Sequence, residues 1–158
     1  MKLFLSICLF LSFSNTPEIT DIRKLYAAVI ISESNAKEFA SKLADIQKDD
    51  NKTLVAYKGA SIVILSRYKK EISEKSKNFN EGAKMVEFAV ASEPKNIEIR
   101  LSIQEKAPKI LNYNKNKKED KDFLLNHYNE QSGNLKAHIK SFMLQSKSFS
   151  TAEKQTIN

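Results

Sequence analysis

Glycine, proline, cysteine and tryptophan are scarce in this chain. Its 158 residues include three Gly, three Pro, one Cys and no Trp. So little turn-forming material disfavours a β-sandwich or β-barrel, which needs many tight turns, and favours helices. Hydrophobic residues make up 41% and charged residues 28%, which is typical of a folded domain rather than of a disordered chain. The length is sufficient for one domain with a core of its own.

The single cysteine lies in the longest apolar run of the chain. Cys8 has no second cysteine with which to form a disulfide. The run Leu3–Phe13 follows Lys2 and ends among small serines, which is the layout of a secretory signal peptide over residues 1–14. It is too short to span a bilayer stably. We therefore expect an exported protein with no stable membrane span after cleavage. A buried N-terminal element of a cytoplasmic protein is the alternative.

Positive charge is in excess but is not segregated. The chain has 26 Lys and Arg against 19 Asp and Glu, for a net charge of +7. Even the most lysine-rich stretch, residues 115–121, contains Glu119 and Asp120. Nucleic-acid-binding proteins gather their basic residues on a patch and interleave aromatic residues with them. The pattern instead indicates solvated helix surfaces and no nucleic-acid partner.

Apolar residues recur at helical spacing along most of the chain after residue 14. This pattern predicts an all-α fold, a compact bundle of about six or seven helices over residues 15–147, followed by a C-terminal tail over 148–158. Ser150 and Glu153 form a capping pattern for a final turn. The expected helices span roughly 17–32, 35–48, 53–72, 78–92, 97–103 and 117–131; Gly133 is expected to break the chain there, and a further helix follows it and ends near 145.

Two of these segments also fit a β-strand. The run SIVIL at 61–65 is uniformly apolar, and the run IEIRLSI at 97–103 alternates strictly between apolar and polar residues. A strand without partners leaves its backbone hydrogen bonds unsatisfied, and only these two candidates are present. We therefore expect both segments to be helical.

Small residues between 59 and 94 suggest a close helix crossing. Gly82, Ala89 and Pro94 are seven and then five residues apart, as in the second half of a tetratricopeptide repeat. There the small residues let two antiparallel helices pack closely, and the proline ends the second helix. The first helix of that repeat also carries a small residue. In this chain Gly59 is the nearest candidate, but it lies about ten residues before the corresponding position. A glycine inside a helix still indicates that another backbone approaches it closely.

A longer string of motifs resembles a group of small exported bacterial proteins with tetratricopeptide-like helices and no assigned function. The motifs are AYKGA, FNEG, AVASEPKNIEIR, QEKAPKIL, NY and DKDF, and they lie between residues 56 and 123. The resemblance implies an all-α fold and a location outside the cytoplasm of a Gram-negative bacterium. It implies no reaction.

Arg100 is the charge that the sequence singles out. It stands between Ile99 and Leu101 in an apolar segment, so its guanidinium is expected to be partly buried and to need an acidic partner. Asp120 is the partner we expect, so that the pair joins two helices; an anion-binding role for Arg100 is the alternative. The tyrosines that could serve as ligand contacts are expected instead at the edge of the core with their hydroxyls at the surface, namely Tyr57, Tyr113 and Tyr128.

Catalytic and metal-binding patterns are not found in the sequence. His127 and His138 are its two histidines, and no acidic or histidine ligands at metal-binding spacing accompany them. A glycine-rich phosphate loop and a nucleophile-elbow serine are also lacking. We therefore expect neither a cofactor nor a metal, and not an enzyme.

Two classes of function remain. The first is a non-catalytic helical interaction or scaffold module with a protein partner, in the periplasm or at the cell envelope. The second is a carrier that binds a small apolar or anionic ligand between helices, near Arg100 and the tyrosines. A cavity that reaches Arg100 would favour the carrier.

Overall fold

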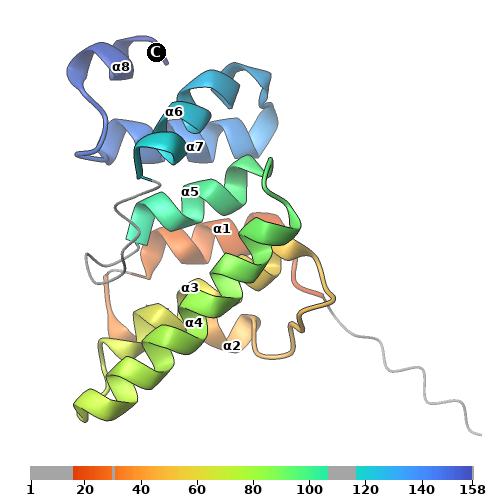
Figure 1. Cartoon of the computed structure of the whole chain (residues 1–158), viewed down its shortest axis with the longest axis vertical. Coiled ribbons are helices and arrows are strands. Elements are labelled where there is room, and N and C mark those ends of the chain that lie inside the picture. The colour runs from red at the N-terminus through yellow and green to blue at the C-terminus, as the bar shows by residue number, and fades with distance from the viewer. Residues whose placement is uncertain (1–15, 30, 107–116, 158) are drawn as a thin grey trace, which may run out of the picture.

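A computed structural model describes residues 16–29, 31–106 and 117–157, with the side chains of 102–106 and 117 left undescribed. All regular secondary structure in these ranges is helical, which confirms the all-α class. The helices are α1 (Ile19–Ala28), α2 (Glu33–Lys42), α3 (Lys52–Ser66), α4 (Ile72–Ser92), α5 (Ile97–Lys106), α6 (Lys117–His127), α7 (Gly133–Gln145) and α8 (Thr151–Gln155), with a short 3₁₀ helix, η2 (Tyr128–Glu130), between α6 and α7. Figure 1 shows α1 to α4 on one side of α5 and α6 to α8 on the other.

Helix starts differ from the sequence-based expectation by two residues or more in three places. Helix α1 begins at Ile19 rather than near residue 17. Helix α2 begins at Glu33 rather than near Asn35, because the hydroxyl of Ser32 accepts a hydrogen bond from the backbone N–H of Asn35 at 3.1 Å and so caps the helix. Helix α4 begins at Ile72, six residues before the expected start near Asn78. The SIVIL run lies inside α3, so it is helical and not a strand.

The first core is built around three aromatic rings from three helices. Tyr26 of α1, Phe39 of α2 and Tyr57 of α3 are at most 1% exposed. The ring centroids of Tyr26 and Phe39 lie 5.5 Å apart, and that of Tyr57 lies 5.1 Å from Tyr26 and 6.1 Å from Phe39. Tilted and edge-on rings at such distances stabilise a core beyond simple burial. The trio ties α1 and α2 to α3.

Helices α3 and α4 form an antiparallel hairpin with a close crossing at two glycines. A Cβ added to Gly59 would lie 2.6 Å from the carbonyl oxygen of Gly82 and 2.8 Å from Val86 Cγ2. A Cβ on Gly82 would overlap the carbonyl oxygen of Gly59 and lie 2.8 Å from Val63 Cγ2. The close approach expected at Gly59 is therefore confirmed, and its partner is Gly82. In a tetratricopeptide repeat the first small residue comes about ten residues later, which here is the turn after α3.

Helix α5 lies between two separate cores, and this explains its alternating sequence. Ile99 packs into the first core, whereas Ile97 and Leu101 belong to the second. Two residues along a helix correspond to a rotation of about 200°, so alternate positions point in nearly opposite directions. A helix covered on both sides can therefore show the period expected of a strand. The preference for helix over residues 97–103 is confirmed.

The second core includes the C-terminal residues that the sequence predicted to be a tail. Phe149 and Ile157 are each 4% exposed and pack with side chains of α6 and α7. Helix α8 lies between them and starts with the expected capping box, in which Ser150 and Glu153 exchange side-chain-to-backbone hydrogen bonds. Lys121 Nζ of α6 lies 2.7 Å from Glu153 Oε1. Residues 148–157 are therefore part of the folded structure, and the prediction of a tail is wrong for them.

None of the described helices combines the length and the apolar composition that a membrane crossing requires. The expected signal peptide, residues 1–14, lies outside the described residues.

Candidate functional site: the buried ion pairs around α5

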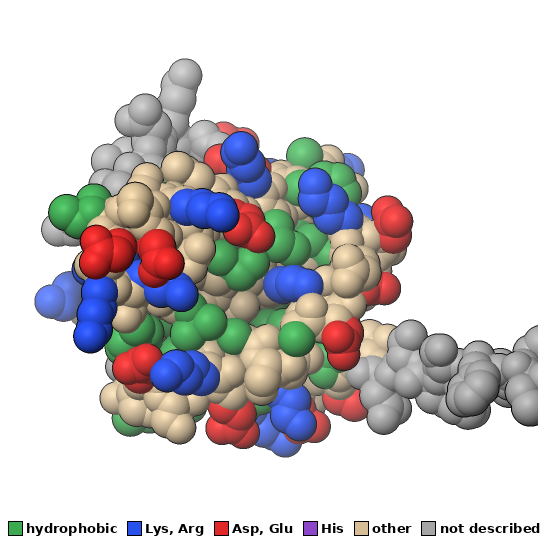
Figure 2. Space-filling view, turned by 90° about the horizontal axis from the view of Figure 1, so that it is seen from below, with side chains coloured by type: hydrophobic (Ala, Val, Ile, Leu, Met, Phe, Trp, Pro, Cys, Tyr) green, Lys and Arg blue, Asp and Glu red, His purple; other side chains and the backbone are tan. Residues whose placement is uncertain are grey.

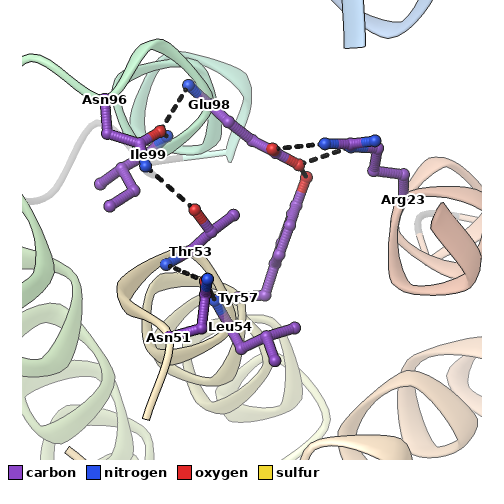
Figure 3. A network of polar contacts seen from close by, with 8 residues as sticks. All are labelled: Arg23, Asn51, Thr53, Leu54, Tyr57, Asn96, Glu98 and Ile99. Atoms are coloured by element: carbon purple, nitrogen blue, oxygen red, sulfur yellow. Dashed lines mark hydrogen bonds and ion pairs between the residues drawn. The ribbon is translucent and has the colours of Figure 1, made fainter. Parts of the chain in front are cut away.

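The carboxylate of Glu98 is one of two buried acidic groups in the described part of the chain. Glu98 is 4% exposed. Arg23 of α1 donates from Nε to Oε1 and from Nη2 to Oε2, each at 2.7 Å. Tyr57 of α3 donates its hydroxyl proton to Oε1 at 2.8 Å. Figure 3 shows both donors pointing at the carboxylate from separate helices. Three helices therefore meet at this one side chain.

Asn96 fixes the start of α5 and thereby the position of Glu98. Its Oδ1 accepts hydrogen bonds from the backbone N–H groups of Glu98 at 3.0 Å and Ile99 at 3.2 Å. Its Nδ2 donates to Thr53 Oγ1 at 3.1 Å and to Glu93 Oε2 at 2.7 Å. Asn96 is thus a helix cap that is also attached to α3 (Figure 3). The capping arrangement leaves Glu98 little freedom to move along the helix axis.

Burial and charge shift the pKa values of both groups that hold Glu98. Desolvation is the largest effect on Tyr57 and, with the adjacent Glu98 carboxylate, holds the pKa of its hydroxyl well above the usual value of 10.0. The hydrogen bond from Arg23 to Glu98 outweighs burial and raises the pKa of the guanidinium. Tyr57 is therefore a neutral donor and Arg23 a permanent cation at physiological pH. Neither is poised to exchange a proton.

A second buried ion pair lies on the other flank of α5. Arg100 Nη1 donates to Asp120 Oδ1 of α6 at 2.7 Å, and the two side chains are 15% and 6% exposed. Arg100 Nε donates to the carbonyl oxygen of Pro94 at 2.7 Å, and the guanidinium carbon lies 4.5 Å from the centre of the Phe123 ring. The predicted pairing of Arg100 with Asp120 is confirmed. Burial raises the pKa of the Asp120 carboxyl, and the hydrogen bond from Arg100 opposes that rise.

The other residues that the sequence singled out, where the structure describes them, take part in helix packing or in hydrogen bonds within the protein. Gly59 and Gly82 meet at the hairpin crossing, and Ala89 is fully buried on α4. Pro94 is exposed and contributes its carbonyl oxygen to Arg100. Tyr113 lies outside the described residues.

The prediction that the tyrosine hydroxyls lie at the surface is wrong for two residues. Tyr57 is 1% exposed, and its hydroxyl is bound to Glu98. Tyr128 is 4% exposed, and its hydroxyl lies 3.5 Å from the carbonyl oxygen of Ile157. Because each hydroxyl finds an acceptor inside the protein, the whole ring can be buried without leaving a polar group unsatisfied.

The surface of α6 contains an open depression of about 480 Å³, and Phe123, one of its lining residues, contacts Arg100. All of its described lining side chains come from α6: Lys118, Glu119, Asp122, Phe123, Asn126 and His127. The imidazole of His127 packs at a tilt against the ring of Phe123, with 4.2 Å between ring centroids, and its Nδ1 lies 2.9 Å from Glu130 Oε2. Among the described residues, no three potential ligands of the His, Cys, Asp and Glu types come together to hold a metal ion.

Sequence reasoning missed Glu98 and Arg23, although a usable signal was present. Glu98 stands between Ile97 and Ile99 just as Arg100 stands between Ile99 and Leu101. The test that identified Arg100 therefore applies equally to Glu98. Arg23 carries no comparable signal, because it stands beside Lys24 and close to Asp21 rather than between apolar residues. Searches of family models, curated proteins and solved structures find no match to this chain.

Proposed function

We propose that the protein is a non-catalytic helical interaction module that acts in the periplasm or at the cell envelope. The observation that carries this proposal is the use of its buried charges. Glu98 and Asp120 are the two buried acids of the described residues, and both are held by an arginine of another helix. Buried charges that are already paired have a structural role and are not free to bind a ligand. We therefore assign the function to the surface of the molecule.

The geometry around Glu98 supports a structural role. Its two oxygens accept three hydrogen bonds from Arg23 and Tyr57. A substrate or ligand that used this carboxylate would have to displace donors that are themselves buried, and an unpaired buried arginine or tyrosine hydroxyl is costly. The same reasoning applies to Arg100, whose guanidinium contacts Asp120, Pro94 and Phe123.

The face formed by α2, α3 and α4 has the composition of a protein-binding surface. Figure 2 shows hydrophobic side chains gathered toward the middle of this face, with Lys, Arg, Asp and Glu side chains around them. Interfaces of modest affinity usually have such an apolar centre and a polar, charged rim. We propose this face as the one that a protein partner contacts.

Site-specific photo-crosslinking in the native host tests this proposal. A photoreactive amino acid at Lys37, an exposed position on α2, should yield a discrete crosslinked product. The matched control is the same amino acid at Ser141, an exposed position on α7 in the other half of the molecule. Equal products from both positions, or none from Lys37, would contradict a partner on the α2–α4 face.

The proposed location rests on the apolar run at residues 3–13. N-terminal sequencing of the protein from its native host should show a start near Asn15 in the extracytoplasmic fraction. Intact Met1 on a cytoplasmic product would remove the envelope from the proposal and leave the interaction module to be tested separately.

The carrier alternative is less well supported. It needs an enclosed space that reaches Arg100, whereas the depression on α6 is open and its described lining does not include Arg100. Arg100 itself already has an acidic partner. We therefore do not assign a ligand to this region.

A further inference from the structure

The turn between α3 and α4, with the first part of α4, projects from the molecule. All residues from 67 to 77 are exposed, and the first buried side chain of α4 is Phe79. At 1.5 Å per residue, the seven residues before Phe79 extend the helix by about 10 Å beyond its packed part. Figure 1 shows this end of α4 at the lower corner of the molecule. We call residues 67–77 the hairpin tip.

The hairpin tip combines exposed apolar side chains with positive charge. Ile72 is 82% exposed and Tyr68 is 38% exposed. Arg67, Lys69, Lys70, Lys75 and Lys77 stand against Glu71 and Glu74, so five cations and two acids leave a net formal charge of +3. Within the described residues, the tip has one ion pair, in which Lys69 Nζ lies 4.0 Å from Glu74 Oε2. Most of its cations can therefore act on an external anion.

We propose that the hairpin tip docks on an anionic lipid surface. Lysine and arginine side chains near a membrane are attracted to anionic headgroups, and Ile72 with Tyr68 supplies an apolar and an interfacial anchor. The tip is convex, so it can enter a deformable headgroup layer, whereas a rigid protein would need a matching pocket. The hairpin tip adjoins the α2–α4 face, because α4 belongs to both. The vesicle test below contains no protein partner, so the two proposals can fail independently.

Vesicle co-sedimentation of the full chain tests this docking. The probes are vesicles of phosphatidylcholine with and without phosphatidylglycerol, at about 0.1 M salt, where exposed charges still act over about 10 Å. The tip variant is Lys70→Glu, Lys75→Glu and Lys77→Glu together. The control variant is Lys84→Glu, Lys95→Glu and Lys147→Glu together, which changes the net charge equally at exposed positions elsewhere.

The preference for anionic over neutral vesicles should be at least about tenfold smaller for the tip variant than for the unmodified protein. The control variant should show a much smaller reduction. Ile72→Ser should weaken binding to the anionic vesicles and leave its salt dependence unchanged. The apolar run at 3–13 is common to all variants, so differences between variants do not arise from it. Circular dichroism should show that each variant retains its helices.

Three results would overturn the proposal. The first is equal loss in the tip and control variants, which would mean that only net charge matters. The second is no preference of the unmodified protein for anionic vesicles. The third is tighter binding to polyglutamate or single-stranded DNA than to the vesicles, with no effect of Ile72→Ser, which would assign the tip to an acidic protein or a nucleic acid instead.

Discussion

Glu98 and Arg100 leave opposite flanks of α5, and each forms a buried ion pair with a different half of the molecule. Glu98 pairs with Arg23 of α1, and Arg100 pairs with Asp120 of α6. Because the two positions differ by about 200° around the helix, one short segment can hold both halves. The two pairs have opposite polarity, since α5 supplies the acid in one and the base in the other.

Arg23→Ala should destabilise the fold strongly. The substitution leaves the carboxylate of Glu98, which is 4% exposed, without its cation, and loss of one partner of a buried pair typically costs about 3–5 kcal/mol. Urea denaturation measures the free energy of unfolding. Lys24→Ala is the neighbouring control: Lys24 and Asp21 are 72% and 68% exposed, and such surface pairs are worth about 0–1 kcal/mol. Similar losses for the two variants would contradict a buried structural pair.

Alkaline pH should destabilise the fold through Tyr57. The pKa of its hydroxyl is raised in the folded state, chiefly by burial and then by Glu98, whereas the unfolded side chain ionises near its usual value of 10.0. The folded state therefore holds this proton more tightly, and the stabilisation is complete below pH 10 and is lost as pH rises above it. Each pH unit in that range removes up to about 1.4 kcal/mol.

Tyr57→Phe provides the control for this pH dependence. The variant lacks the hydroxyl, so it should lose about 1.5–3 kcal/mol at neutral pH with the hydrogen bond to charged Glu98. Its stability should then fall less steeply than that of the unmodified protein above pH 10, as followed by urea denaturation at a series of pH values. Parallel curves for the two proteins would show that another group causes the alkaline loss.

Gly82→Leu should cost about 2 kcal/mol or more. Even a Cβ at this position would overlap the carbonyl oxygen of Gly59 and crowd Val63, so the hairpin would have to open. Ala91→Leu is the matched control, because Ala91 is exposed on the same helix. Thermal unfolding should separate the two variants clearly. A Gly82 variant as stable as the control would mean that α3 and α4 do not cross there.

The sequence allowed much of the fold to be predicted where one local signal dominated. Apolar spacing placed most helices, and Ser150 with Glu153 gave the last cap correctly. The start of α4 was missed because residues 72–77 are all exposed, so no apolar stripe marks them. The tail assignment failed because Phe149 and Ile157 are isolated apolar residues whose burial depends on α6 and α7. Such long-range packing has no signature in a local window.

The candidate site was predictable only in part for the same reason. Arg100 was identifiable because a charge inside an apolar segment needs a partner, and Asp120 was the acid chosen for it. The role of Glu98 followed from the same pattern but also required knowing that α5 has two covered sides. Arg23 and Tyr57 come from helices far away in the sequence, and only the folded arrangement brings them to one carboxylate.

The most direct test of the central claim, that the charges flanking α5 hold the fold rather than bind a ligand, is a double-mutant cycle on Arg100 and Asp120. Unfolding free energies of Arg100→Ala, Asp120→Asn and the double variant give the coupling energy of the pair. We predict a coupling above about 1 kcal/mol and an unfolding midpoint of the unmodified protein that does not change with inorganic phosphate. A coupling near zero, with phosphate stabilisation that Arg100→Ala abolishes, would contradict the claim and make Arg100 an anion-binding residue.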